Sequence, residues 1–227
     1  MKTLRSLLPA ALVLSWTGCT TVVTPSPKEQ AQLAVLASSA DLHEKARACQ
    51  ELAVFAGPAS VPALAALLDQ ENLADYARSG LEGIKDSSAG DALRQALGKL
   101  SGRQLAGVVN SLGVRRETAA VPDLQQLILD PKQGAVAEAL AALGLIGSAE
   151  AARILQTFLT HGPADLRVPA AHAALTAAAQ LAKEDNVAAA RGLLDAVGRA
   201  LPDGNLATVA KNQVAAFDAS RGPAARK

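Results

Sequence analysis

Apolar residues recur along this chain at helical spacing, within a motif that returns about every thirty residues. Residues 61–69 carry its clearest copy, with apolar positions separated by 3, 3 and 1 residues, which places them on one face of a helix. Further copies lie at 92–97, 121–130 and 152–159. Four leucines mark the copies, at steps of 29, 31 and 31 residues: Leu64, Leu93, Leu124 and Leu155. A fixed period of this size is typical of stacked supersecondary units.

A second apolar segment with helical spacing follows each of the first three copies and finishes near a glycine. The segments cover 73–84, 104–114 and 135–146, and the glycines are Gly83, Gly113 and Gly144. A glycine there either permits a left-handed closing residue or lets neighbouring backbones approach. Each unit therefore predicts two helices joined by a short turn.

The flanking regions extend this pattern. Residues 41–55 predict a second helix without a complete first partner, which we assign to the N-terminal cap. A longer alanine-rich helix is expected at 166–181, then a closing pair at 187–201 and 206–219. Because no single pair could bury its apolar stripe alone, the fold class expected is an all-α, right-handed α-solenoid of stacked antiparallel helix pairs.

The residues of the motif carry a family resemblance. Val61-Pro62, then Leu64, then Leu67-Leu68-Asp69, with a glycine-ended second helix and the thirty-residue step, resemble bacterial HEAT repeats. The short period is most similar to the phycobilisome-lyase type. This resemblance implies a non-catalytic scaffold that binds another protein, and it leaves a tetrapyrrole or chromophore lyase, or an accessory enzyme subunit, as the alternative. A third possibility is a purely structural spacer.

The N-terminus reads as an export signal. Lys2 and Arg5 precede a short apolar run, and residues 1–18 end before Cys19 in a sequence that resembles a bacterial lipobox. Trp16 stands where that pattern prefers Leu, so a plain secretory signal or a retained anchor stays open. Lipidation of Cys19 would anchor the protein on the periplasmic side of the cell envelope, and Thr20 implies the outer membrane by the same resemblance.

The expected domain organisation follows from these segments. Residues 19–40, rich in Thr, Ser and Pro, are expected to form an extended tether; 41–202 the repeat domain; and 203–227 a capping helix with a basic tail. Without the signal, 20 basic residues stand against 21 acidic ones, which does not favour nucleic acid as a partner. Aromatic residues make up only 2% of the chain, too few for the apolar, aromatic-lined pocket that a tetrapyrrole needs.

The sequence offers little for catalysis, metal or a cofactor. His43, His161 and His172 are far apart and belong to no metal-ligand spacing. Cys49 lies within an apolar helical pattern, where a small buried residue is expected. No phosphate loop or nucleophile motif occurs, so we expect no catalytic residue, no cofactor and no small-molecule substrate.

Polar side chains on the second helices are the candidate partner-binding residues. The resemblance to HEAT repeats implies that these helices line the concave surface, and Tyr and Arg are frequent interface anchors. The candidates are Tyr76, Arg78, Arg103, Asn110, Arg115 and Arg116. The alternative is that Arg78 pairs with Glu82 along its own helix and that Arg115 and Arg116 form a solvated turn.

Overall fold

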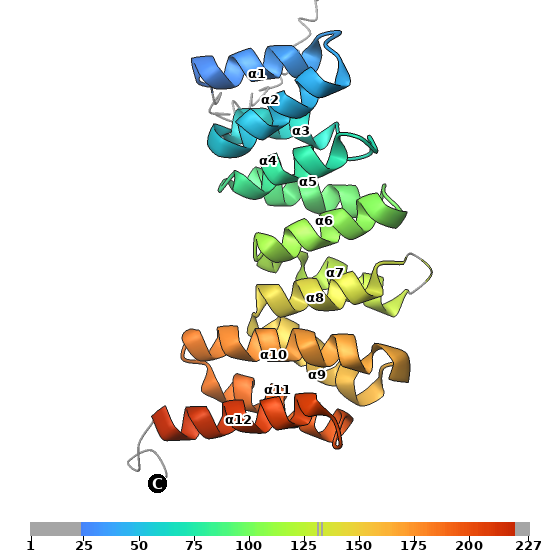
Figure 1. Cartoon of the computed structure of the whole chain (residues 1–227), viewed down its shortest axis with the longest axis vertical. Helices are drawn as coiled ribbons and strands as arrows, with labels where there is room; N and C mark the ends of the chain where they lie inside the picture. Colours follow the sequence, from blue (N-terminus) through green and yellow to red (C-terminus); the bar gives the residue numbers. More distant parts are fainter. Residues whose placement is uncertain (1–23, 131, 133, 221–227) are drawn as a thin grey trace, which may run out of the picture.

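The computed structural model describes residues 24–130, 132 and 134–220, and this part of the chain is a single column of α-helices (Figure 1). The predicted signal peptide, Cys19, the first residues of the predicted tether and the predicted basic tail from residue 221 lie outside the described residues. No helix among the described residues is long and apolar enough to cross a membrane.

The described helices form six consecutive pairs. The first helices of the pairs are α1 (Pro27–Ala37), α3 (Val61–Ala65), α5 (Ser87–Leu97), α7 (Val121–Leu129), α9 (Ala149–His161) and α11 (Val187–Ala200). The second helices are α2 (Leu42–Phe55), α4 (Ala74–Gly83), α6 (Gly102–Val114), α8 (Val136–Ile146), α10 (Arg167–Lys183) and α12 (Asn205–Ser220). Short 3-10 turns precede α3, α7 and α10.

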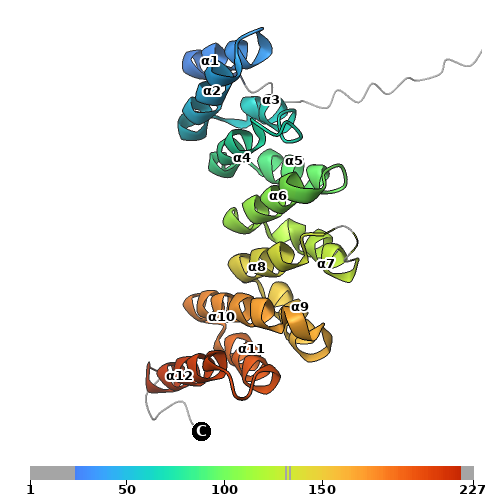
Figure 2. The ribbon, with the colours of Figure 1, turned by 45° about the vertical axis from the view of Figure 1, so that its right-hand side comes forward.

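Each pair packs on the next, so the predicted all-α solenoid of stacked helix pairs is confirmed. The second helices contact one another in series from α2 to α10, and α12 closes the stack mainly against α11. In Figure 2 the column bows gently, with the second helices on its inner, concave side and the first helices on its outer side.

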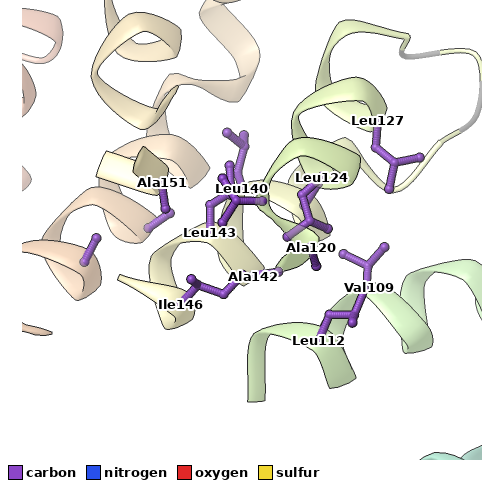
Figure 3. Close-up of a cluster of buried hydrophobic side chains, with 14 of the residues drawn as sticks. Val109, Leu112, Ala120, Leu124, Leu127, Leu140, Ala142, Leu143, Ile146 and Ala151 are labelled. Carbon is purple, nitrogen blue, oxygen red and sulfur yellow. The ribbon is translucent and has the colours of Figure 1, made fainter. Parts of the chain in front are cut away.

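Leucines of the repeated motif supply the core. Leu64, Leu93, Leu124 and Leu155, the residues that define the period, are fully buried. Figure 3 shows one layer of this core, where side chains from α6, α7, α8 and α9 converge between the helices. One continuous cluster runs from Cys49 in α2 to Ala210 in α12, so every layer shares apolar surface with its neighbours.

The repeated glycines allow the second helices to pack closely. A Cβ atom on Gly83, Gly113 or Gly144 would lie 2.9 Å from Ala53 O, 2.8 Å from Ala142 Cα and 2.7 Å from Ala173 O, respectively. All three neighbours are backbone atoms of the adjacent second helix. Of the two roles expected for these glycines, close backbone approach is therefore the one that applies; the left-handed closing residue of α8 is Gly147.

The N-terminal part of the fold differs from the sequence prediction. The extended tether expected over 19–40 is wrong for residues 27–37, which form α1, and the cap at 41–55 is an ordinary second helix paired with it. Ser26 and Glu29 form a capping box that starts α1. Glu29 also accepts hydrogen bonds from Ser60 Oγ at 2.6 Å and Gly57 N at 2.9 Å, which ties α1 to the turn before α3.

The hydrogen bonds around Glu29 favour the charged form of its carboxyl group. Burial raises the pKa of its carboxyl, but the hydrogen bonds from Ser60, Gly57 and Ser26 outweigh burial and hold the pKa below its ordinary value.

A second difference from the sequence prediction is that α3 ends at Ala65 instead of residue 69. Its last turn tightens into hydrogen bonds of the 3-10 type, from Leu67 N to Leu64 O and from Leu68 N to Ala65 O.

Candidate functional site

Arg78 lies between two neighbouring second helices instead of standing free on the surface. Its side chain, 16% exposed, extends from α4 over Gly107 of α6 and donates to Gly107 O at 3.1 Å and Ser111 Oγ at 3.2 Å. Ser111, which is fully buried, donates in turn to Glu82 at 2.6 Å. Arg78 therefore reaches Glu82 only through Ser111, and its direct ion pair, at 2.7 Å, is with Asp75.

Asp75 joins this group to the other candidate on α6. Arg103 Nη2 lies 2.6 Å from Asp75 Oδ2, although both side chains are largely in solvent, at 73% and 49% exposure. Hydrogen bonding to Arg78, together with the two positive charges, lowers the pKa of Asp75. Asp75, Arg78 and Arg103 thus form a charged cluster at the N-terminal ends of α4 and α6.

The consecutive arginines at the end of α6 extend in opposite directions along the stack. Arg115, whose side chain is 7% exposed, donates to Leu81 O at 2.7 Å and also to Ile84 O, at the C-terminal end of α4. Arg116 donates to Ile146 O at the end of α8, and its guanidinium lies 2.6 Å from Glu184 after α10. The solvated turn is thus wrong for Arg115.

Backbone conformation explains this divergence. Arg116 has a φ of +52°, a left-handed conformation that closes α6, while Glu117 N donates to Leu112 O across the helix end. A cation at a helix C-terminus is favoured by the helix dipole and by unpaired carbonyl groups. Arg78 and Arg115 are therefore contacts between repeats, and only 16% and 7% of their side chains, respectively, is exposed.

Other residues form the accessible concave surface. Two rows of exposed residues follow the second helices, each with a constant step of 31 residues. We call these eight residues the concave strip: Ser79, Asn110, Ala141 and His172 in one row, and Gly83, Val114, Leu145 and Thr176 in the other. No residue of the concave strip carries a formal charge with His neutral, so it differs from the charged cluster beside it.

The strip exposes apolar side chains that the sequence analysis did not select. Val114 is 52% and Leu145 38% exposed, and Leu145 Cδ1 lies against Gly113, beside Val114. The sequence contained a signal for these two exposed side chains, because each directly follows a glycine of the repeat. Of the predicted candidates, Asn110 belongs to the strip and Tyr76, 37% exposed, lies on the same helix as Ser79.

An apolar groove lies on the opposite side of the stack, between α7 and α9. Its volume is about 460 Å³, and Ile128, Leu129, Ile154 and Phe158 supply most of its apolar lining. His161 borders it and its Nδ1 lies 3.2 Å from Thr157 O, so the imidazole contacts its own helix. Glu150 and Arg153 of α9 also line the groove.

The remaining candidate chemistry is dispersed. Cys49 is fully buried, and desolvation raises the pKa of its thiol to about 11. Across residues 24–130, 132 and 134–220, no group of three or more His, Cys, Asp or Glu residues is placed to hold a metal ion. His43 and His172 are exposed on different helices, α2 and α10.

Comparison with known proteins agrees with the fold. Residues 90–176, from α5 into α10, match the family model of HEAT repeats. No curated protein matches the chain. HEAT repeats are commonly non-enzymatic scaffolds for protein interactions, so the match supports the fold and this broad class of function.

Proposed function

We propose that this chain is a non-catalytic HEAT-repeat scaffold, lipid-anchored in the cell envelope, that binds another protein through the concave strip. The observation that carries the proposal is that Val114 and Leu145 are exposed side by side, from neighbouring second helices, in a strip without formal charge. Exposed apolar side chains set among polar neighbours are typical of protein-binding surfaces.

The rigidity of the second helices supports the same function. Backbone contacts at Gly113 and Gly144 fix α6, α8 and α10 against one another, so the part of the strip on these three helices has its shape before any partner arrives. A preformed surface loses little conformational entropy on binding. Tyr76 and Arg103 border the strip and stay predicted contacts; Arg116, 41% exposed, stays one at the far end of α6.

Site-specific photocrosslinking in intact cells tests the interaction. A photoreactive residue at Asn110 or Thr176 should crosslink one and the same protein. Probes at Gln95 and Gln126, exposed on first helices, are the matched controls and should not capture it. Leu145→Glu should then abolish the crosslink from position 110, because burying an unpaired carboxylate in the interface is unfavourable.

Two results would contradict the proposed surface. Equal capture from the first-helix probes would mean that contact is nonspecific, and an unaltered crosslink in Leu145→Glu would mean that the strip does not carry the binding. Helical content by circular dichroism should be the same in the parent and in Leu145→Glu, because the side chain is partly exposed.

The membrane anchor is a separate part of the proposal, and it rests on the lipobox resemblance around Cys19. Two or three acyl chains on one cysteine hold a protein stably, since each buried CH₂ contributes about 0.8 kcal/mol. Metabolic labelling with a fatty-acid analogue should mark the parent and not Cys19→Ala. Equal labelling of both would refute the anchor and leave the scaffold proposal standing.

A further inference from the structure

The contact between α4 and α6 differs from the other contacts between second helices. At the α2–α4, α6–α8 and α8–α10 contacts, a glycine of one helix faces backbone atoms of the other. At α4–α6, no glycine faces the backbone of the other helix in this way; instead the guanidinium of Arg78 covers Gly107 in the middle of α6, with Nε and Cζ 2.6 and 2.7 Å from an ideal Cβ position. The α4–α6 contact is also less extensive than the α2–α4 and α6–α8 contacts.

A group of polar side chains crosses this contact on the concave side. Arg78, Ser111 and Glu82 make a hydrogen-bonded chain across it, while Arg78 Nε has no hydrogen-bond partner among the described residues. Breaking apolar contacts exposes hydrocarbon to water, whereas groups in a polar contact are rehydrated when it opens. On the concave side, the α4–α6 contact therefore costs less to open than the neighbouring contacts between second helices, while α3 stays packed on α5 on the outer side.

The two ends of the contact are held unequally. At the C-terminal end, the buried Arg115 binds carbonyl oxygens of Leu81 and Ile84, and apolar side chains underneath stay packed. At the N-terminal end, the tie is the exposed ion pair between Asp75 and Arg103. Exposed pairs contribute only about 0–1 kcal/mol and are screened by salt.

We propose that the α4–α6 junction is a hinge of the solenoid: α1–α4 and α5–α12 move as two blocks, pivoting about Arg115, and the Asp75–Arg103 pair acts as an electrostatic latch. Opening would spread α4 from α6 at their N-terminal ends and change the curvature of the concave face. The hinge depends on the packing of the stack alone and does not require the proposed binding partner.

The concave strip offers two matched spin-label pairs for a pulsed electron paramagnetic resonance distance measurement. Ser79→Cys with Ala141→Cys spans the junction; Asn110→Cys with His172→Cys spans the same number of residues entirely within the second block. Both pairs are made in the full chain with its native cysteines replaced by Ala. Helices packed about 8–10 Å apart place both pairs roughly 20 Å apart.

Raising the ionic strength from about 0.1 M to about 1 M shortens the Debye length from about 10 Å to about 3 Å and so screens the latch. At about 1 M, we expect the pair across the junction to give a distance distribution about twice as broad as that of the control pair. Asp75→Asn should produce the same broadening at low salt, because it removes the charge of the latch. The control pair should be unaffected by either change.

Three outcomes would overturn the hinge. Equal widths for both pairs at both ionic strengths would show a uniformly stiff stack. Parallel broadening of both pairs would show general flexibility without a hinge. A junction pair that responds to neither salt nor Asp75→Asn would show that the exposed ion pair is not the latch. Unchanged helical content by circular dichroism must accompany each variant for the distances to be compared.

Discussion

Replacing Gly144 with alanine tests how closely the second helices pack. Gly144 lies near the end of α8, and a Cβ there would be 2.7 Å from Ala173 O and 2.8 Å from Ala173 Cα. Both are backbone atoms of α10, so no rotamer change can relieve the overlap. To reach an ordinary contact of 3.4 Å, the helices must separate locally by about 0.7 Å.

The magnitude follows from two opposing effects. Alanine in place of glycine inside a helix normally stabilises it by about 0.5–1 kcal/mol. Forcing an extra methyl group into a packed contact costs about 1–3 kcal/mol, because a gap of 0.5–1 Å elsewhere loses a quarter to a half of the dispersion energy of the atoms involved. We expect a net destabilisation of roughly 1–2 kcal/mol for Gly144→Ala.

Gly192→Ala is the matched control. Gly192 lies inside α11, and a Cβ there would meet no atom within 4 Å, so this variant should gain about 0.5–1 kcal/mol. Urea unfolding followed by circular dichroism measures both changes. If Gly144→Ala proved as stabilising as Gly192→Ala, the close approach of α8 and α10 would be refuted.

Three further predictions concern buried polar groups and the thiol. Glu29→Gln should lower the free energy of unfolding by about 1–3 kcal/mol at neutral pH. Because folding lowers the pKa of Glu29, its carboxylate stabilises the fold above the ordinary pKa of 4.5, and this stabilisation is lost as the pH falls through the folded pKa. The unfolding free energies of parent and variant should therefore converge in acid. Arg115→Ala should cost about 1–3 kcal/mol in urea unfolding because buried carbonyls lose their donor, whereas Arg103→Ala, at an exposed ion pair, should cost less than about 1 kcal/mol. In a Cys19→Ala chain, Cys49 should react with a thiol reagent at pH 8 only as fast as the protein unfolds, since its pKa is about 11; rapid labelling of the native protein would contradict its burial.

Sequence periodicity was sufficient for most of the fold because stacked repeats place equivalent residues in equivalent environments. The leucines that define the period are all buried, and the predicted helices from 41 to 219 are present in the structure. Helix α1 was missed because Pro25, Pro27 and a weak apolar pattern indicate an extended segment. The capping box of Ser26 and Glu29 was the local signal that indicated a helix start.

The contact surface was harder to predict, for a different reason. A sequence shows that an arginine lies on a second helix, but not whether it contacts the next repeat or solvent. Arg78 and Arg115 bind atoms 29 to 34 residues away, a distance set by stacking and invisible in the pattern of either helix alone. The exposed positions of Val114 and Leu145 were accessible in principle, through their constant step of 31 residues.

The ion pair between Arg116 and Glu184 affects how the protein unfolds. In a stack whose layers touch only their neighbours, a boundary between ordered and melted layers can settle anywhere at similar cost. Arg116 skips a layer, because it ends α6 while Glu184, 68 residues later, follows α10. Losing α10 therefore also deprives α6 of a contact, but because the two side chains are 41% and 50% exposed, this contact couples the three successive layers by only about 0–1 kcal/mol.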